Sequence, residues 1–181
     1  MNHGRIEYVR NDKKFKEDLI RAGRLLQRFN LANYENDELK RRVLGELFGS
    51  VGKGVTIDHN FHCDFGYNIH VGENFYAGFN CTILDIAEVR IGDNCLIAPN
   101  VGIYTAGHSI HPVDRHKSGF AEPITIGNNV WIGGHSSIIG GVEIGNNSVI
   151  AAGSVVIKDV PDNVVFGGNP AKKIRDIDST Q

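Results

Sequence analysis

The chain lacks three features that would quickly place a protein in a class: a surplus of one charge, a long apolar run and paired cysteines. Its 19 Lys and Arg residues nearly balance 21 Asp and Glu residues, and the formal net charge is -2. Proteins that grip nucleic acid or an anionic membrane normally carry a basic surplus on one face, so we expect neither partner. No stretch approaches about 18 consecutive apolar residues, and no apolar segment follows Met1, so the sequence predicts neither a membrane span nor a secretion signal.

Cysteine usage points to a reducing environment. The three cysteines, Cys63, Cys81 and Cys95, are an odd number, and no two of them have C-x-x-C spacing. The pattern therefore indicates neither a disulfide framework nor a zinc knuckle. Together with the missing secretion signal, it predicts a soluble, cytoplasmic protein.

Residues 12–48 carry a helical pattern. Apolar residues recur at intervals of three, four and seven, which gives an apolar stripe along each helix. A polar stretch at residues 33–37 is suited to join two helices and to cap the second. The length of 181 residues suits one domain with a small appendage. We therefore divide the chain into an N-terminal helical region, residues 1–50, and a second region, residues 51–181.

The second region repeats every six residues. Taken in steps of six, 13 of 15 positions hold Ile or Val. The positions are Val51, Ile57, Cys63, Val71, Ala77, Ile83, Ile91, Ile97, Ile103, Ile126, Ile132, Ile138, Ile144, Ile150 and Val156. Such repetition is typical of architectures in which stacked units share a continuous core. We expect these side chains to form that core.

A longer repeat contains the short one. The pattern aliphatic-Gly-x-Asn starts at Val71, Ile91, Ile126 and Ile144, at intervals of 20, 35 and 18 residues. The unit is thus 18 residues, or three hexapeptides, with a 17-residue excess before Ile126. Three short strands per unit, joined by turns in which Gly and Asn tolerate positive φ, predict a mainly β fold. We expect a parallel β-helix of about five triangular coils with one long inserted loop, at about residues 105–122.

His108 lies where the inserted loop begins, in the stretch Thr105-Ala-Gly-His. A long insertion in a tight solenoid is typical of a functional loop. An imidazole whose pKa is near 6.5 can accept a proton at neutral pH and return it later, provided that its other ring nitrogen is held. The residues alone leave two readings open, a general base and an ordinary surface histidine.

Two long segments resemble a known family. They are "NFYAGFNCTILDIAEVRIGDNCLIAPNVGIYTAGH", residues 74–108, and "PITIGNNVWIGGHSSIIGGVEIGNNSVIAAGSVVIKDVPDNVVFGGNPAKKI", residues 123–174. They are similar to the maltose, galactoside and nodulation sugar O-acetyltransferases, and the helical start with "FHCDFGYNIHVG", residues 61–72, is most similar to the maltose branch. The resemblance implies a left-handed β-helix and acetyl transfer from acetyl-CoA to a sugar hydroxyl. It also implies that His108 is the catalytic base and that no metal is required.

The same resemblance assigns binding residues. For acetyl-CoA it implies Trp131, Gly134, Ala152, Lys158, Lys172 and Arg175. For the acceptor it implies Asp64, Tyr76 and Asn80. Cationic side chains suit the phosphates of CoA, and carboxylate and amide groups suit sugar hydroxyls. The family further implies a homotrimer with active sites between subunits, and flat prism faces fit such cyclic symmetry.

Two positions depart from the family pattern. Gly78 stands where the family usually has an asparagine that is thought to steady the oxyanion, a contribution that can be worth a few kcal/mol. Arg10 stands near the place of an acceptor-binding acidic residue. These differences leave the identity of the acceptor open.

Two other functions are compatible with a β-helix. One is a metal enzyme similar to the γ-class carbonic anhydrases, because His111-x4-His116 has a suitable spacing. Here, however, the two histidines belong to the inserted loop rather than to regular coils. The other is a non-catalytic ligand-binding or assembly module, which Gly78 would favour. Joint retention of His108, Trp131 and the GGNPAK segment favours the enzyme.

Overall fold

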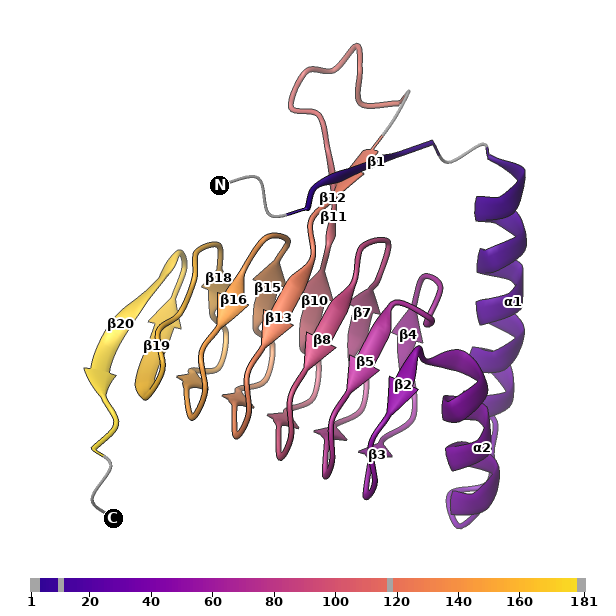
Figure 1. Cartoon of the computed structure of the whole chain (residues 1–181), viewed down its shortest axis with the longest axis horizontal. Coiled ribbons are helices and arrows are strands. Elements are labelled where there is room, and N and C mark those ends of the chain that lie inside the picture. The colour runs from indigo at the N-terminus through magenta and orange to yellow at the C-terminus, as the bar shows by residue number, and fades with distance from the viewer. Residues whose placement is uncertain (1–3, 10–11, 117–118, 179–181) are drawn as a thin grey trace.

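A computed structural model describes residues 4–9, 12–116 and 119–178 of the chain. Two helices, α1 (Lys13–Asn30) and α2 (Asp37–Leu47), precede a prism of short strands (Figure 1). The side chains of Asp12 and Asn36 cap them, accepting hydrogen bonds from the amides of Phe15 and Leu39. The two helices confirm the helical pattern of the sequence, and both turn their apolar stripes onto the N-terminal end of the prism.

The prism has three faces. Face 1 contains β2 (Ser50–Val51), β5 (Ile69–Val71), β8 (Val89–Ile91), β13 (Ile124–Ile126) and β16 (Glu143–Ile144). Face 2 contains β3 (Thr56–Ile57), β6 (Tyr76–Ala77), β9 (Leu96–Ile97), β14 (Trp131–Ile132), β17 (Val149–Ile150), β19 (Val164–Gly168) and β20 (Ala171–Asp176). Face 3 contains β4 (His62–Cys63), β7 (Thr82–Leu84), β10 (Gly102–Tyr104), β15 (Ser137–Ile139) and β18 (Val155–Val156).

The chain passes from face 1 to face 2 to face 3 in every coil, and the coils wind left-handed (Figure 1). We name the turns accordingly: the first corner joins faces 1 and 2, the second joins faces 2 and 3, and the third joins face 3 back to face 1. The neighbouring strands are parallel, except that β20 runs antiparallel to β19. The coil number corrects our expectation of about five: β19 pairs with β17 and Val160 bridges Ile144, which adds an incomplete sixth coil.

The repeated aliphatic residues form the core, as predicted. Ile83, Ile103, Ile138 and Val156 stand in register on face 3, and each is at most 2% exposed. The inward side chains of the first coil meet Phe29, Leu47 and other apolar residues of the two helices in one continuous cluster. The helices thus cover the N-terminal end of the core, which an open first coil would expose to water.

Asparagines at the first corner hold neighbouring coils together. Asn74, Asn94, Asn129, Asn147 and Asn163 all have positive φ, and the side-chain amide of each of the first four donates to the next asparagine at 2.8–3.1 Å. Asparagine tolerates this backbone conformation better than most residues do. One residue type therefore satisfies both the turn and the hydrogen-bond ladder, which explains the aliphatic-Gly-x-Asn repeat.

Breaking this ladder should destabilise the prism in two separable ways. We expect Asn129→Ala to lower the free energy of unfolding by about 2 kcal/mol, because it removes hydrogen bonds on both sides and leaves, at a φ of 57°, an alanine that tolerates this conformation less well than asparagine does. Asn129→Gly loses the same hydrogen bonds but accepts that φ, so it should cost about half as much. Urea unfolding of the two variants measures the difference, and equal losses would contradict the backbone part of the explanation.

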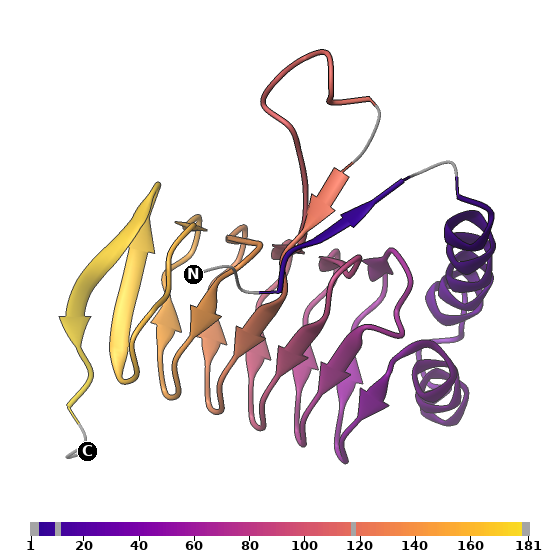
Figure 2. The ribbon, with the colours of Figure 1, turned by 45° about the horizontal axis from the view of Figure 1, so that its top comes forward.

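The insertion is more ordered than a loop. Its two ends form an antiparallel ribbon, β11 (Ala106–His108) and β12 (Gly119–Ala121), and the N-terminal strand β1 (Ile6–Tyr8) adds to the outer side of β12. The ribbon rises from the third corner, above the prism (Figures 1 and 2). The sequence predicted the insertion but neither the ribbon nor β1. No helix in the described ranges is long and apolar enough to cross a membrane.

Candidate active site

His108 is the last residue of β11, and its side chain is exposed. The ribbon that carries it is anchored at Thr105, which is 1% exposed. The Thr105 hydroxyl donates to the carbonyl of Leu84 at 2.6 Å and accepts from the amide of Ala87 at 3.1 Å. The amide of Glu122, on the return strand, donates to the carbonyl of Thr105 at 3.0 Å. The ribbon is thus bonded to the prism through Thr105, and its two ends are bonded to each other, so the prism fixes the base of the strand that carries His108.

Two aspartates lie on the same third corner, in the coils below His108. Asp64 belongs to the first coil and Asp85 to the second. Asp85 is fully buried, and its carboxylate accepts hydrogen bonds from the amides of Asp64, Phe65 and Asn68 at 2.9–3.3 Å. It therefore fixes the turn that carries Asp64. Sequence reasoning missed Asp85, although an acidic residue inside the apolar run "TILDIA" was a usable signal.

Asp85 should make stability depend on pH. Burial raises the pKa of Asp85 from 3.8 to about 6, despite the amide donors that favour ionisation. The folded chain then binds more protons than the unfolded chain between these values, so this contribution to stability is present below pH 4 and is lost as the pH rises through 6. We expect the difference in unfolding free energy between the natural chain and Asp85→Asn to fall by up to about 3 kcal/mol over this range. Urea unfolding at several pH values measures this difference in free energy, and a difference that does not change with pH would contradict the expected role of Asp85.

A row of aromatic rings runs beside the third corner. Tyr8 stacks on Phe15 with centroids 5.6 Å apart, Phe15 meets Phe65 edge to face at 5.1 Å, and Phe65 stacks on Tyr67 at 5.3 Å. These rings, with Ile86 and other residues, line a cavity of about 270 Å³. At the other end of the row, Tyr8 meets the imidazole of His108 at 6.5 Å. Tyr8 therefore borders the cavity, whereas His108 is not among the residues that line it.

Polar side chains also line that cavity. The hydroxyl of Tyr67 donates to Asp18 at 2.9 Å, and Lys14 forms an ion pair with the same carboxylate at 2.9 Å. The hydrogen bond from Lys14 holds the pKa of Asp18 below its usual value. Burial and the bond to Asp18 raise the pKa of Tyr67 to about 12, so its hydroxyl remains a hydrogen-bond donor at neutral pH.

Most of the residues assigned to acetyl-CoA lie elsewhere, on face 2 and the second corner. Trp131 is 53% exposed and stands in register with Leu96 and Tyr76, so all three side chains project from face 2. Lys172 and Arg175 lie on β20 of the same face. Gly134 and Ala152 occupy the second corner in adjacent coils. Lys158, in contrast, lies at the third corner, between β18 and Val160.

The residues assigned to the acceptor are divided in the same way. Asp64 shares the third corner with His108. The hydroxyl of Tyr76 donates to Asp58 at 2.8 Å on face 2. Asn80 is a second-corner turn residue with a φ of 63°, and its amide donates to Asn100 at 3.2 Å. Within one chain, the structure brings Asp64 and Lys158 to the corner of His108, and it leaves Tyr76, Asn80 and Trp131 on the opposite side of the prism.

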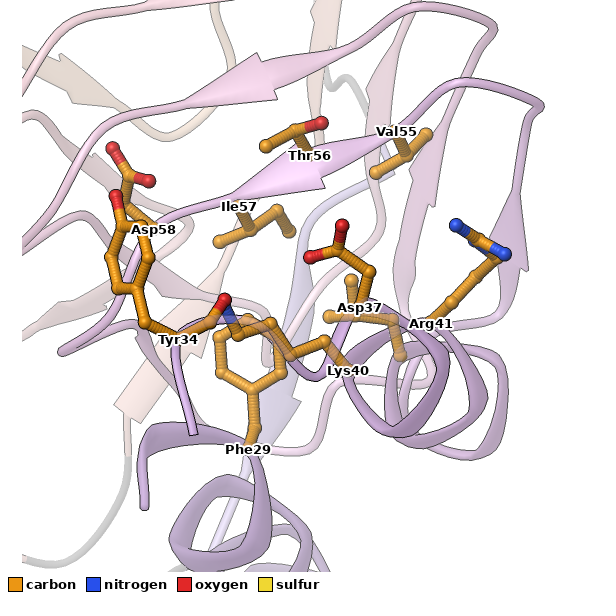
Figure 3. A pocket seen from close by; sticks show the side chains of 10 residues that line it. Phe29, Tyr34, Asp37, Lys40, Arg41, Val55, Thr56, Ile57 and Asp58 are labelled. Atoms are coloured by element: carbon orange, nitrogen blue, oxygen red, sulfur yellow. The ribbon is translucent and has the colours of Figure 1, made fainter. Parts of the chain in front are cut away.

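A second cavity lies at the N-terminal end of the prism, and His108 is not among the residues that line it. It is about 170 Å³ in volume and lies between the helical cap and β3 (Figure 3). Tyr34 and Asp58 are at one end, and Asp37 and Arg41 are at the other. This cavity belongs to the contact between the helices and the first coil, so it does not complete the surroundings of His108.

Gly78 lies against the next coil. A β-carbon at this position would lie 2.8 Å from Cδ of Pro99. The asparagine that the family usually has there would therefore require Pro99 to move. Arg10, the other departure from the family pattern, lies outside the described residues.

The loop histidines His111 and His116 are exposed. In the described ranges, no three His, Cys, Asp or Glu residues are grouped so that they could hold a metal ion. Cys63, Cys81 and Cys95 are free thiols.

Comparison with known proteins identifies the class first. Residues 7–52 match the maltose acetyltransferase hexapeptide capping motif, and residues 123–158 match the bacterial transferase hexapeptide repeat. The helical cap and the prism are therefore those of a hexapeptide-repeat transferase.

Relatives then give the family. Galactoside O-acetyltransferase of Escherichia coli is 44% identical over an alignment of 186 positions. The alignment covers 98% of this chain and 91% of that protein. The crystal structure of a maltose O-acetyltransferase from Clostridium difficile superimposes with a TM-score of 0.94 at 45% identity, covering 96% of this chain and 93% of the other. A galactoside acetyltransferase in complex with coenzyme A has a TM-score of 0.93 at 43% identity, covering 95% and 86%. The chain belongs to the maltose and galactoside O-acetyltransferase family, so it is an acetyltransferase, as the sequence predicted.

Proposed function

We propose that the chain transfers the acetyl group of acetyl-CoA to a hydroxyl of a sugar or sugar-like acceptor, with His108 as general base. The observation that carries the proposal is the position of His108: an exposed imidazole on a ribbon that Thr105 bonds to the rigid prism of this family. The relatives named for maltose and galactoside support the acceptor class, and the complex with coenzyme A supports the donor.

The proposed chemistry needs one base and no covalent enzyme intermediate. His108 accepts the proton of the acceptor hydroxyl, and the oxygen attacks the thioester carbonyl of acetyl-CoA. The tetrahedral intermediate collapses, the carbon–sulfur bond breaks, and the imidazolium returns the proton to the departing thiolate. The products are the acetyl ester and CoA. The described cysteines have no role as nucleophiles in this scheme, which fits Cys81 and Cys95, whose pKa values are raised by burial.

We further propose that the active site lies between two copies in a homotrimer. Within one chain, His108 and Asp64 occupy the third corner, while Trp131 and Arg175 occupy face 2, opposite that corner. A donor held on face 2 cannot serve the His108 of its own prism. In a cyclic trimer the corner of one copy can meet face 2 of the next, because such heterologous contacts close into a ring.

The test of the activity is release of CoA from acetyl-CoA in the presence of a panel of sugars and glycosides, with mass spectrometry of the acetylated product. The proposal requires acceptor-dependent release. If no sugar or glycoside raises CoA release above simple hydrolysis, the acceptor class is wrong. The proposed location is the cytoplasm, which the free cysteines support.

A further inference from the structure

Tyr8, Gly119 and His108 form one row across the ribbon. Gly119 on β12 stands directly opposite His108 on β11 and also opposite Tyr8 on β1. Directly opposed residues on neighbouring strands point to the same face of a sheet. The residue between the tyrosine and the histidine is therefore a glycine, which has no side chain to occupy the space between them.

The ring of Tyr8 fills that space. A β-carbon at residue 119 would overlap the outer end of the Tyr8 ring, so the ring lies across the glycine. In this position it meets the imidazole of His108 edge to face, with centroids 6.5 Å apart and planes at 66°. Tyr8 is only 9% exposed although it belongs to an edge strand. The glycine is thus what allows a contact that spans two strands.

The other side of the Tyr8 ring is also fixed. It stacks on Phe15 of α1 with an angle of 8° between the planes, and Phe15 packs in turn on Phe65 of the first coil. The backbone of β1 is held along β12, where Ile6 pairs with Ala121 and the guanidinium of Arg5 lies 3.8 Å from the centroid of Phe120. Figure 2 shows β1 lying along this ribbon. The helical cap, the prism and the ribbon together set the position of Tyr8.

Tyr8 is the neighbour of the His108 imidazole that can set its orientation. Within the described part of the chain, the ring contact with Tyr8 is the one interaction assigned to the imidazole. The χ2 torsion of histidine is intrinsically broad, so the imidazole needs a neighbour to fix it. A base that is misaligned by about 1 Å can lose a factor of about 10² in rate.

We propose that Tyr8 is a positioning residue for His108: its ring, seated over Gly119 and backed by Phe15, holds the imidazole in the orientation that accepts the acceptor proton. The inference rests on the proposed role of His108 as base. It assigns a function to a strand that lies at the start of the chain and pairs with the inserted ribbon. It also explains why residue 119 is a glycine.

Three variants test the proposal. Tyr8→Ala removes the ring, Gly119→Ala displaces it while leaving Tyr8 in the sequence, and Tyr8→Phe keeps it. We expect the first two to lower kcat by a factor of about 10 to 10², with the KM for acetyl-CoA unchanged, and Tyr8→Phe to stay within about threefold of the natural enzyme. Tyr34→Ala, which removes a tyrosine that is 68% exposed at the helical end, is the matched control and should leave kcat unchanged.

A spectroscopic readout separates positioning from general damage. The ring protons of His108, assigned by their loss in His108→Ala, should shift in Tyr8→Ala and in Gly119→Ala, because they lose the ring current of Tyr8, but not in Tyr34→Ala. Thermal unfolding of each variant shows whether it remains folded at the assay temperature. Measuring two different substitutions keeps the test valid if one of them fails to fold.

Two results would overturn the proposal. One is a His108 signal that does not move when the Tyr8 ring is removed or displaced. The other is a shifted signal with kcat unchanged, which would make the contact real but irrelevant to positioning. If instead His108→Ala retains full turnover, the proposed role of His108 is wrong and Tyr8 has no base to position, so the two failures remain distinct.

Discussion

Replacing His108 with alanine lowers kcat for acetyl transfer by a factor of about 10² to 10⁴, which is the usual contribution of a positioned general base. The substitution should leave thermal stability nearly unchanged, because the side chain is exposed and lies at the end of an edge strand. Binding of acetyl-CoA should also survive, because face 2 is untouched. Steady-state kinetics at saturating donor, with a thermal melt of each sample, measure both expectations.

The chain supplies its own control for this experiment. His111 lies three residues further along the same exposed loop, outside the ribbon that Thr105 anchors. His111→Ala should therefore keep kcat within a few-fold of the natural enzyme, although the KM for the acceptor can change if the loop borders the entrance. Equal losses in both variants would mean that the loop as a whole, rather than one imidazole, is required. Full turnover by His108→Ala would remove the proposed mechanism.

The prism could be predicted because the residue type that each short strand or turn needs locally is also the one that the stacked coils need. Most inward positions hold a β-branched residue, such as Ile83, and each first corner holds a residue that accepts positive φ, such as Asn94. The same two demands therefore recur in successive coils. Repetition then reveals the period without any knowledge of the partners. The incomplete sixth coil was not predicted, because β19 breaks the six-residue spacing and continues into the antiparallel β20.

The ribbon could not be predicted from any local pattern. Its strands are three residues long, and β1 joins β12 across more than a hundred residues of sequence. Nothing periodic marks "IEY" or "GFA" as strands, because their stability comes from each other and from Phe15 and Phe65 beneath them. Tyr8 therefore carried no signal in the sequence, and its contact with His108 is visible only in three dimensions.

For the candidate site, the sequence supplied residues and an expected place between subunits, and both remain predictions. Resemblance assigns His108, Trp131 and Asp64 to a single reaction, whereas the order of faces within an 18-residue coil decides where each side chain points. His108 and Asp64 fall on the third corner, and Trp131 falls on face 2. Within one chain the third corner and face 2 are too far apart to form one site, whereas two neighbouring copies can bring them together. This difference can be tested directly.

Two inactive variants should restore activity when they share a trimer. One carries His108→Ala, which damages the third corner and leaves face 2 intact. The other carries Trp131→Ala with Arg175→Glu, which damages face 2 and leaves the third corner intact; both side chains are outward on that face, so the prism core is preserved. If each site combines the corner of one copy with face 2 of the next, a mixed trimer has one junction at which both halves are natural.

Co-expression of the two variants with different affinity tags, followed by purification on both tags, isolates the mixed trimers. Of the three junctions in each, one is complete whether the ratio of variants is two to one or one to two, so we expect about one third of the natural activity. Each variant expressed alone should be nearly inactive. Mixed trimers as inactive as the parents would show that every site is built within one chain, whereas failure to isolate any doubly tagged species would exclude the oligomer itself. Because one outcome concerns the site and the other concerns the assembly, the experiment tests the two parts of the proposal separately.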